Sequence, residues 1–326
     1  MTLKIGIFGT GSFGSMHARM LAGMDGVEIS AICGTSLEKA EHMARDFRDA
    51  KAYATVTDML NDKKLDAAYI CVPPFAHEEI EEGLAGQGIP FFVEKPLAAD
   101  LETPSRILKA VTEKSLITSV GYHFRYMDGT ARALELLGDR TVGMALGYWM
   151  GEMPSVSWWR QQQGSGGQFV EQTTHIVDLL RYLLGEVEEV SATFARRHMH
   201  SKVEGVEVPD VGTVTLKLEC GAIATIANTC MMPLGHKMGL DVYTDAGVLE
   251  LSQTGLKDIG VGQTTEYLNN ANNSLTPYEK ANSIFIHAVR TGDATGILST
   301  YADAWRTQQI TTAANRSAQT GQTIRL

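Results

Sequence analysis

The chain has 326 residues, which is long for one domain and comfortable for two at about 150 residues each. Hydrophobic residues make up 44% and charged residues 20%, and these ordinary proportions exclude disorder, collagen and coiled coil as descriptions of the whole chain. With 28 Lys and Arg against 38 Asp and Glu, the net charge is −10, which repels phosphate backbones and argues against a nucleic acid partner.

Short apolar runs alternate with helical patterns over residues 1–121. The sequence predicts strands at 3–8, 27–33, 67–72, 89–93 and 117–121, and helices at 15–23, 37–47, 77–85 and 105–114. This alternation is typical of βαβ units, and continuous apolar strands are typical of a parallel sheet covered on both faces. We therefore predict a doubly wound α/β domain, a Rossmann-type domain, over this stretch.

The pattern changes over residues 122–326, which we predict to form an α+β domain. Helices are predicted at 128–137, 170–184, 277–289 and 301–314, and strands of alternating polarity at 189–194, 212–218, 222–229 and 238–244. Such consecutive strands favour a mainly antiparallel, open-faced sheet. We expect residues 262–277 to be a long loop, and the helix at about 300–315 to pack back on the first domain.

The cysteines bear on the cellular compartment. Cys33, Cys71, Cys220 and Cys230 are far apart without CxxC spacing, so we expect reduced packing residues and a cytoplasmic location. No apolar run approaches the roughly 18 residues of a membrane helix, and residues 1–14 lack the features of a signal peptide. No membrane partner is expected.

Residues 9–14, GTGSFG, follow the first predicted strand and open a helix, which is the context of a dinucleotide-binding GxGxxG turn. The first glycine allows the tight turn, the second allows backbone to approach a pyrophosphate, and the third allows helix and strand to pack closely. The helix N-terminus then supplies N–H donors and positive dipole. A merely structural turn is the alternative. The residues assigned to the cofactor are Gly9, Gly11, Ser12, Phe13 and Gly14.

The end of the second predicted strand bears on the choice between NAD and NADP. An acidic residue about 20 positions after the glycines would bind the ribose 2′-hydroxyl of NAD, but no carboxylate precedes Glu38 here. The hydroxyls of Thr35 and Ser36, with the ammonium of Lys39, can hold a 2′-phosphate instead. We therefore favour NADP over NAD. The alternative is that Thr35 or Ser36 simply caps the next helix.

Glu94, Lys95 and Pro96 follow the buried strand that ends at Val93. In a doubly wound sheet the carboxyl ends of the strands face the ligand crevice, where a lysine can stabilise negative charge on a substrate oxygen. Pro96 restricts Lys95 to extended geometry. On this evidence alone, Lys95 is as readily a surface lysine as a catalytic one.

With these motifs the chain resembles the Gfo/Idh/MocA oxidoreductases, the family of glucose–fructose oxidoreductase and inositol dehydrogenase. The resemblance covers essentially the whole chain, through GTGSFG with His17, VPPFAH at 72–77, EKP at 94–96, GYHFRY at 121–126 and GGQFVEQTTHIVDLLRYLLG at 166–185. It implies an NAD(P)-dependent enzyme that transfers a hydride between nicotinamide and a carbinol or ketone carbon of a sugar or polyol. It also implies further cofactor contacts at Val72, Pro73, His77, Glu94 and Lys95.

Glu171, His175 and Asp178 are spaced i, i+4 and i+7, so they share one stripe of the predicted helix at 170–184. Carboxylates beside an imidazole raise its basicity, which suits a general base that takes a proton from a carbinol. A solvated polar face is the alternative. The resemblance implies that Lys95 and His175 are the catalytic pair, with Glu171 where many relatives have Asp. We expect Asp178 to support either a site residue or the structure.

In the implied mechanism, Lys95 polarises the substrate oxygen and His175 removes the hydroxyl proton while hydride passes to the nicotinamide. Aromatic rings near a glycine-rich loop can stack on a sugar, and polar residues after the last strand of the first domain can enter the crevice; buried packing is the alternative for each. The expected substrate residues are Tyr122, His123, Arg125, Trp159, Arg160 and His175.

Two other functions stay open: an NAD-dependent glycosidase that uses transient oxidation, and a non-catalytic cofactor-binding sensor. No metal is expected, because His198 and His200 have no third ligand nearby. A sheet without helical cover on one face exposes an apolar patch unless a partner buries it, so with the family resemblance we predict a homodimer or homotetramer.

Overall fold

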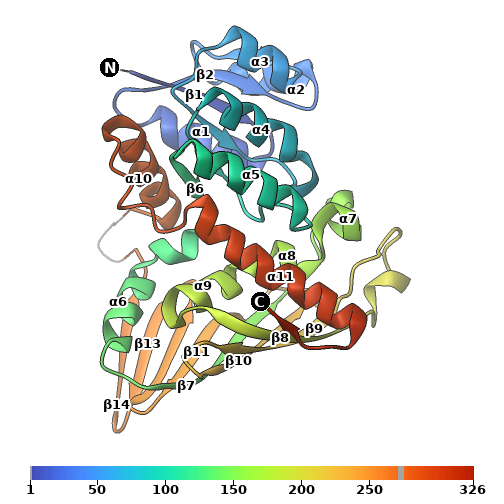
Figure 1. Ribbon diagram of the computed structural model, residues 1–326, viewed down its shortest axis with the longest axis vertical. Helices are drawn as coiled ribbons and strands as arrows, with labels where there is room; N and C mark the ends of the chain where they lie inside the picture. Colours follow the sequence, from blue (N-terminus) through green and yellow to red (C-terminus); the bar gives the residue numbers. More distant parts are fainter. Residues whose placement is uncertain (1, 271–274) are drawn as a thin grey trace. The chain divides into compact units, whose positions relative to one another are not determined.

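The computed structural model describes residues 2–270 and 275–326, and these form two compact units (Figure 1). Unit 1 comprises Met1–Ala98, Glu102–Gly121 and Tyr278–Trp305. Unit 2 comprises Ala99–Leu101, Tyr122–Pro277 and Arg306–Leu326. Unit 1 therefore contains the predicted first domain together with a segment encoded more than 150 residues later.

The sheet of unit 1 has six parallel strands in the order β3-β2-β1-β4-β5-β6. They are β1 (Leu3–Phe8), β2 (Val27–Cys33), β3 (Lys51–Tyr53), β4 (Ala67–Ile70), β5 (Phe91–Val93) and β6 (Thr118–Val120). The strand order reverses between β1 and β4, which is the switch point where doubly wound sheets bind ligands. The predicted doubly wound α/β fold is confirmed.

Helices of unit 1 are α1 (Ser12–Ala22), α2 (Leu37–Ala44), α3 (Val56–Asp62), α4 (Glu78–Gln87), α5 (Glu102–Glu113) and, apart from its first residue, α10 (Pro277–Thr291), with the 3-10 turn η1 (Pro74–Ala76). The segment Tyr278–Trp305 is joined to strand β6 by hydrogen bonds of backbone and side-chain groups. Val120 N donates to Ser299 O at 2.9 Å, and Tyr301 N donates to Thr118 Oγ1 at 3.1 Å. Residues 278–305 thus extend the core of the doubly wound domain.

Unit 2 contains a nine-stranded sheet in the order β14-β13-β12-β11-β7-β10-β9-β8-β15. Its strands are β7 (Val142–Met150), β8 (Val187–Ala195), β9 (Val211–Leu218), β10 (Ile223–Thr229), β11 (Met238–Thr244), β12 (Gly247–Ser252), β13 (Gly255–Gly260), β14 (Gln263–Leu268) and β15 (Ile324–Arg325). Among the described residues of this sheet, β7 and β10 are the one parallel pair and the other neighbours are antiparallel, so the mainly antiparallel sheet is confirmed.

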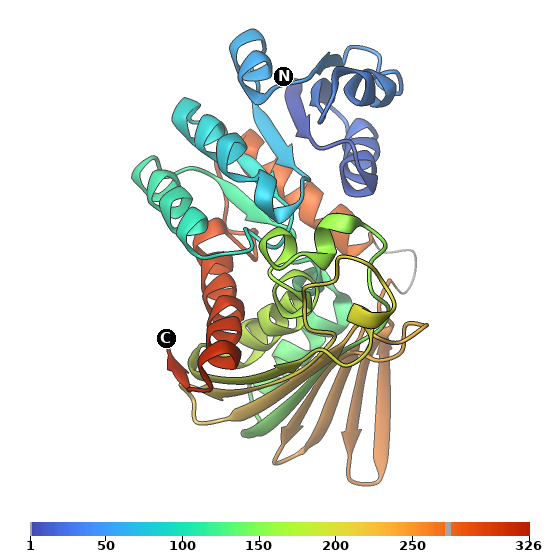
Figure 2. The same ribbon diagram turned by 90° about the vertical axis from the view of Figure 1, so that its right-hand side faces the viewer.

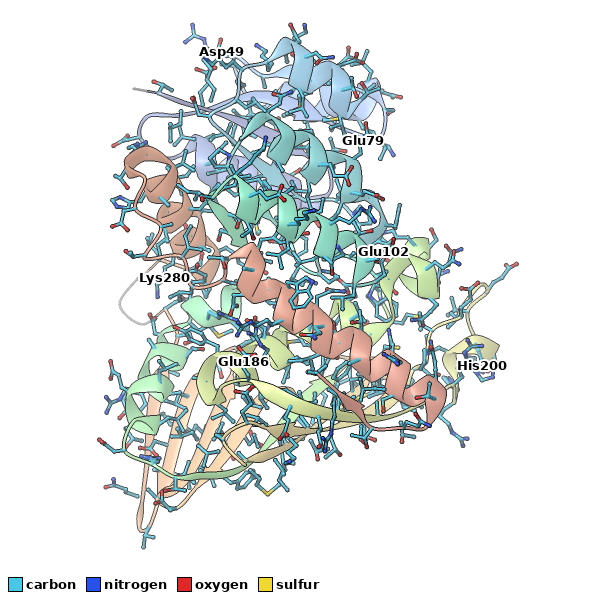
Figure 3. The ribbon with its side chains drawn as sticks, in the orientation of Figure 1. Asp49, Glu79, Glu102, Glu186, His200 and Lys280 are labelled. Carbon is cyan, nitrogen blue, oxygen red and sulfur yellow. The ribbon has the colours of Figure 1, made fainter. Side chains whose placement is uncertain are left out.

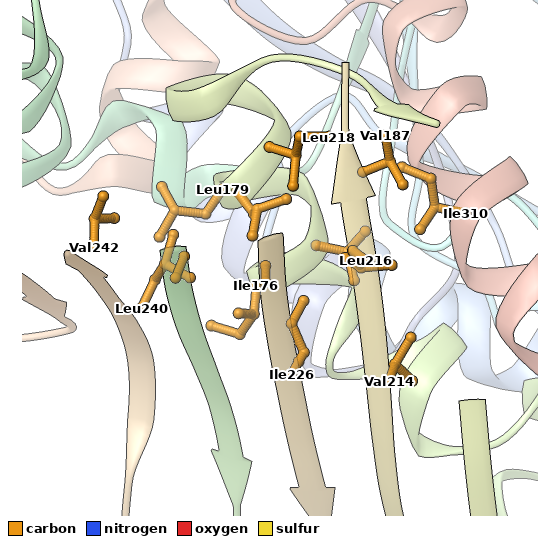
Figure 4. Close-up of a cluster of buried hydrophobic side chains, with 14 of the residues drawn as sticks. Ile176, Leu179, Val187, Val214, Leu216, Leu218, Ile226, Leu240, Val242 and Ile310 are labelled. Atoms are coloured by element: carbon orange, nitrogen blue, oxygen red, sulfur yellow. The ribbon is translucent and has the colours of Figure 1, made fainter. Parts of the chain in front are cut away.

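One face of this sheet buries the core of unit 2 (Figure 4). Helices α6 (Asp128–Leu137), α9 (Thr174–Leu184) and the later part of α11 (Tyr301–Thr320) lie on that face (Figure 2). Ile176 and Leu179 of α9 pack among fully buried sheet residues such as Ile226. The close approach has a local cause: a Cβ on Gly147 of β7 would lie 2.6 Å from Ile176 Cγ2. The remaining short helices are η2 (His123–Tyr126), η3 (Ser157–Arg160), α7 (Gln162–Ser165), α8 (Gln168–Glu171) and η4 (Met199–Ser201).

Two sequence predictions about unit 2 are wrong. The helix predicted at 170–184 is two helices, because α8 ends at Glu171 and α9 begins at Thr174. The Gln168 side chain bonds Thr229 O at 3.0 Å and Asn228 Nδ2 at 2.7 Å, which holds α8 against β10 and turns the chain there. The loop predicted at 262–277 contains strand β14; its residues 271–274 lie outside the described part of the chain.

Candidate active site

The glycine-rich turn has the geometry that a dinucleotide requires. Gly9 has φ +107°, and a Cβ there would collide with the carbonyl oxygen of Cys71. A Cβ on Gly14 would collide with the carbonyl oxygen of Gly9, whereas a Cβ on Gly11 would meet nothing within 4 Å. The N-terminus of α1 has no side-chain cap and no acidic residue in its first turn. Open space beside uncapped N–H donors fits a pyrophosphate.

The predicted 2′-phosphate residues lie at the start of α2. Ser36 caps this helix and accepts a hydrogen bond from Lys39 N at 3.3 Å, while Lys39 Nζ donates to Thr35 Oγ1 at 3.1 Å. Thr35 and Lys39 are exposed. Burial, together with the charges of Glu79 and Asp58, raises the pKa of the Cys33 thiol at the end of β2 to about 11. Ser36 therefore caps α2, which was the alternative to phosphate binding. The carboxylates of Glu79 and Asp58 lie near the end of β2.

His77 fixes the loop that follows β4. Its Nε2 lies 3.1 Å from Val72 O and its Nδ1 lies 3.3 Å from Glu81 Oε1. A carbonyl only accepts, so Nε2 carries a proton. Tyr301 donates to the other oxygen of Glu81 at 3.2 Å, and all three side chains are buried. His77 thus holds the loop containing Pro73; its contact with a cofactor stays a prediction.

Lys95 is the second residue after β5, and the carboxylate of Glu94, the first, is held by a residue that sequence reasoning did not assign. Glu94 Oε1 lies 3.0 Å from His17 Nε2, and His17 Nδ1 lies 2.9 Å from Asn282 Oδ1 of α10. His17 and Asn282 are fully buried. His17 lies on the buried face of α1, which periodicity can indicate; Asn282 is 265 positions away and gave no signal.

His175 occupies the first turn of α9 in unit 2 and is 5% exposed. Its ring lies 5.0 Å from that of Phe124 and 5.7 Å from that of Trp149, at interplanar angles of 21° and 13°. The rings of His123 and Tyr122 meet it edge-on at 4.8 and 5.9 Å. The imidazole therefore lies in an aromatic surrounding that excludes most water.

Glu171 lies on α8, separate from the helix of His175, so the predicted single stripe is incorrect. Its Oε2 accepts a hydrogen bond from Trp159 Nε1 at 2.7 Å. The Trp159 side chain is 1% exposed, which fits packing, the alternative considered for it. Arg160, half-buried, donates to Ser155 O at 3.0 Å.

Asp178 supports the structure through a buried ion pair with Arg125. The carboxylate accepts Arg125 Nε at 2.7 Å and Nη2 at 2.6 Å, and also Thr307 Oγ1 at 3.0 Å. Tyr122 is fully buried and bonds Thr174 Oγ1 at 2.8 Å. Burial, followed by the charge of Asp178, raises the pKa of Tyr122, so its phenol stays protonated.

The structure thus gathers the predicted residues into groups within each unit. Unit 1 contains the glycine turn, the Thr35–Lys39 pair and the Glu94–Lys95 strand end; unit 2 contains the ring cluster around His175. His200 of the His-x-His pair lies exposed on the 3-10 turn η4 of unit 2 (Figure 3). Just before it, the backbone N–H groups of Arg197, His198 and Met199 donate to the Asp210 carboxylate.

A parallel sheet with a pyrophosphate-binding turn at its switch point, followed by a mainly antiparallel sheet whose packed helix α9 contains a buried histidine, defines a nicotinamide-dependent oxidoreductase of two-domain type. Residues 3–122 match the family model "Oxidoreductase family, NAD-binding Rossmann fold", and residues 140–250 match the "GFO/IDH/MocA C-terminal domain". The chain belongs to the Gfo/Idh/MocA oxidoreductases, which confirms the resemblance.

Curated relatives include inositol 2-dehydrogenase/D-chiro-inositol 3-dehydrogenase of Lacticaseibacillus casei, 28% identical over 79% of this chain and 75% of that protein. Myo-inositol 2-dehydrogenase of Thermotoga maritima is 26% identical over 75% and 74% of the two chains. A solved structure of GenD2 from gentamicin A biosynthesis, in complex with NAD, is similar with a TM-score of 0.85 at 23% identity. The similarity covers 100% of this chain and 96% of that one. These similarities support an oxidoreductase acting on CH–OH groups with a nicotinamide cofactor. Within the described residues, every helix is too short or too polar to cross a membrane.

Proposed function

We propose that this enzyme transfers a hydride between a nicotinamide dinucleotide and a carbinol or ketone carbon of a sugar, polyol or related polyhydroxylated molecule. The observation that carries the proposal is the imidazole of His175 in its aromatic, nearly water-free surrounding, in a chain that also has a pyrophosphate-binding turn. A cofactor-binding sensor needs only the turn. The inositol dehydrogenases among the relatives support a polyol as substrate.

Each protein group has a defined role in this proposal. The bound cofactor supplies the hydride acceptor for oxidation and the hydride donor for reduction. Lys95 donates a hydrogen bond to the substrate oxygen, and His175 accepts the hydroxyl proton as the C–H bond gives up its hydride and C–O becomes C=O. Reduction reverses these transfers. Glu171, which accepts the Trp159 indole N–H at 2.7 Å, is proposed as the acidic residue that assists His175 in this proton transfer.

Burial divides the predicted substrate residues into two groups. His123 and Arg160 are half-buried, and we propose that they contact substrate hydroxyls. Tyr122, Arg125 and Trp159 are less than 5% exposed and have hydrogen-bond partners, so we propose that they shape the surroundings of the substrate.

We also propose NADP as the preferred cofactor, with Lys39 and Thr35 as the 2′-phosphate residues. Lys39→Ala is expected to raise the KM for NADP about tenfold and leave the KM for NAD nearly unchanged, because only NADP carries the phosphate charge. Lys109→Ala, an exposed lysine on α5, is the control. Equal effects of Lys39→Ala on both cofactors would exclude this assignment.

The homodimer or homotetramer and the cytoplasmic location are part of the same proposal. Exposed apolar residues of the unit 2 sheet, among them Ile223 at 52% exposure, support a sheet covered by another copy. Sedimentation at micromolar concentration is expected to show an oligomer, and a stable monomer would contradict it.

The function is tested with purified protein and a panel of inositols, aldoses, uronates and glycosides. We expect net formation of reduced nicotinamide with at least one polyol or sugar. Lys95→Ala and His175→Ala are each expected to lower kcat by two orders of magnitude or more, while Lys109→Ala leaves it unchanged. Sugar release without net reduction identifies the glycosidase, and tight cofactor binding without any turnover identifies the sensor.

A further inference from the structure

His17 occupies an enclosed position at the carboxyl edge of the parallel sheet. Its side chain is fully buried, and its ring lies 5.1 Å from Phe92 and 5.4 Å from Tyr69. Each ring nitrogen has a hydrogen-bond partner: Nε2 lies 3.0 Å from Glu94 Oε1, and Nδ1 lies 2.9 Å from Asn282 Oδ1. A polar ring in an apolar surrounding is stable only when both nitrogens are satisfied, and here they are.

The two neighbours orient the hydrogen bonds of the His17 ring. Asn282 Nδ2 faces the sulfur of Met20 at 3.5 Å, which places the amide oxygen toward His17 Nδ1. An amide oxygen and a carboxylate are both hydrogen-bond acceptors, so each contact needs a proton, one on Nδ1 toward Asn282 and one between Nε2 and Glu94. The imidazole therefore links the Glu94 carboxylate to the Asn282 amide through two hydrogen bonds.

The Glu94 carboxylate is also confined on its other side. A Cβ on Gly121 would lie 2.6 Å from Glu94 Oε2, so the backbone after β6 packs directly against it. Glu94 N donates to Ile70 O at 2.8 Å, and Gly121 N donates to Val93 O at 2.9 Å. Both the main chain and the side chain of Glu94 are thus held, one residue before Lys95.

We propose that His17 is a positioning residue for the reaction: with Asn282 behind it, His17 holds the Glu94 carboxylate and thereby the strand end that presents Lys95 to the substrate. The inference rests on the proposed role of Lys95. Without the imidazole, Glu94 would be a buried carboxylate that must move toward water or toward the neighbouring ammonium, and either movement displaces Lys95.

The test compares three variants of the full-length enzyme. His17→Phe keeps an aromatic ring in the same surrounding and removes both hydrogen bonds. His17→Gln keeps an amide donor for Glu94. Asn282→Leu removes the acceptor behind the imidazole and serves if His17→Phe does not fold. For each we would measure kcat and KM, the Kd of the reduced dinucleotide, and the rate at which acetic anhydride acetylates Lys95, with Lys39 and Lys109 as internal references.

We expect His17→Phe to lower kcat about tenfold or more, because Glu94, and with it Lys95, loses a hydrogen bond to a charged group, and such a bond corresponds to about tenfold or more in rate. The Kd of the reduced dinucleotide should stay within about threefold of the wild-type value, a smaller change than the loss of one such hydrogen bond would cause. The acetylation rate of Lys95 relative to the references should change, and His17→Gln should restore it. Unchanged kcat and unchanged Lys95 acetylation in a folded His17→Phe would overturn the inference. If the wild-type enzyme has no turnover, the proposed function fails, and Lys95 acetylation alone still decides whether His17 positions it.

Discussion

The ion pair between Arg125 and Asp178 gives the sharpest prediction about stability. Both side chains are at most 4% exposed, and the carboxylate accepts two guanidinium hydrogen bonds and one hydroxyl hydrogen bond, from Thr307. Asp178→Leu would leave the guanidinium buried without its carboxylate, although the ring of Tyr182 remains 4.9 Å from it. Removal of one partner of such a pair costs about 3–5 kcal/mol.

The double variant decides whether this cost arises from an isolated charge. Arg125→Met with Asp178→Leu removes both charges and refills the space with apolar groups, which is often nearly neutral for buried pairs. We therefore expect each single variant to lose about 4 kcal/mol of unfolding free energy and the double variant no more than about 2 kcal/mol. The double variant is thus expected to lose less unfolding free energy than either single variant. Two independent packing defects would instead add their losses.

Urea unfolding of unit 2 measures these values. Trp149, Trp158 and Trp159 lie in unit 2, and Trp305→Phe removes the remaining tryptophan, so fluorescence then reports unit 2 alone. Lys217→Ala, which removes the exposed pair with Glu188, is the control and should cost less than about 1 kcal/mol. Additive losses in the double variant would refute the reasoning.

Three further changes are expected to have measurable effects. Gly14→Ala should abolish dinucleotide binding in calorimetry, because its Cβ meets a backbone carbonyl, whereas Gly86→Ala, where a Cβ meets nothing within 4 Å, should not. Burial opposes ionisation of Asp210, but hydrogen bonds from backbone N–H groups hold the pKa of this carboxyl below its ordinary value. The ionised carboxylate therefore stabilises the folded protein fully above about pH 4, and this stabilisation is lost as pH falls through the lower pKa of the folded state. Thermal unfolding of Asp210→Asn should lack this decline. Ile226→Ala should cost about 2–5 kcal/mol in urea unfolding, and Ile223→Ala, at a half-exposed position of the same strand, clearly less.

The parts of the fold that the sequence predicted are those with long or continuous apolar patterns. Strands β1, β2 and β11 and helix α6 have the predicted bounds. Strand β3 has three residues and β7 includes Gly147, so neither gives a pattern that a window of residues can detect. Gly147 is required by the packing of α9 on the sheet, which is a tertiary constraint.

The candidate site was predictable where one local motif supplies the chemistry. The glycine turn contains its own strand, turn and helix, so its geometry follows from six consecutive residues. The group around Glu94 needs His17 from α1 and Asn282 from α10, which only the folded chain brings together. Periodicity could place His17 on a buried face but could not name its partners.

The break between α8 and α9 shows why spacing alone misassigned Glu171. An i, i+4 relation places two side chains side by side only if the helix is continuous, and here the chain turns at Gln172 and Thr173. The turn gives Glu171 a partner in Trp159, so this carboxylate accepts an indole N–H that a straight helix would not bring to it. We expect Trp159→Phe, which removes this donor from the Glu171 carboxylate, to alter the pH dependence of kcat more than the KM, because Glu171 is proposed to assist His175 in the proton transfer.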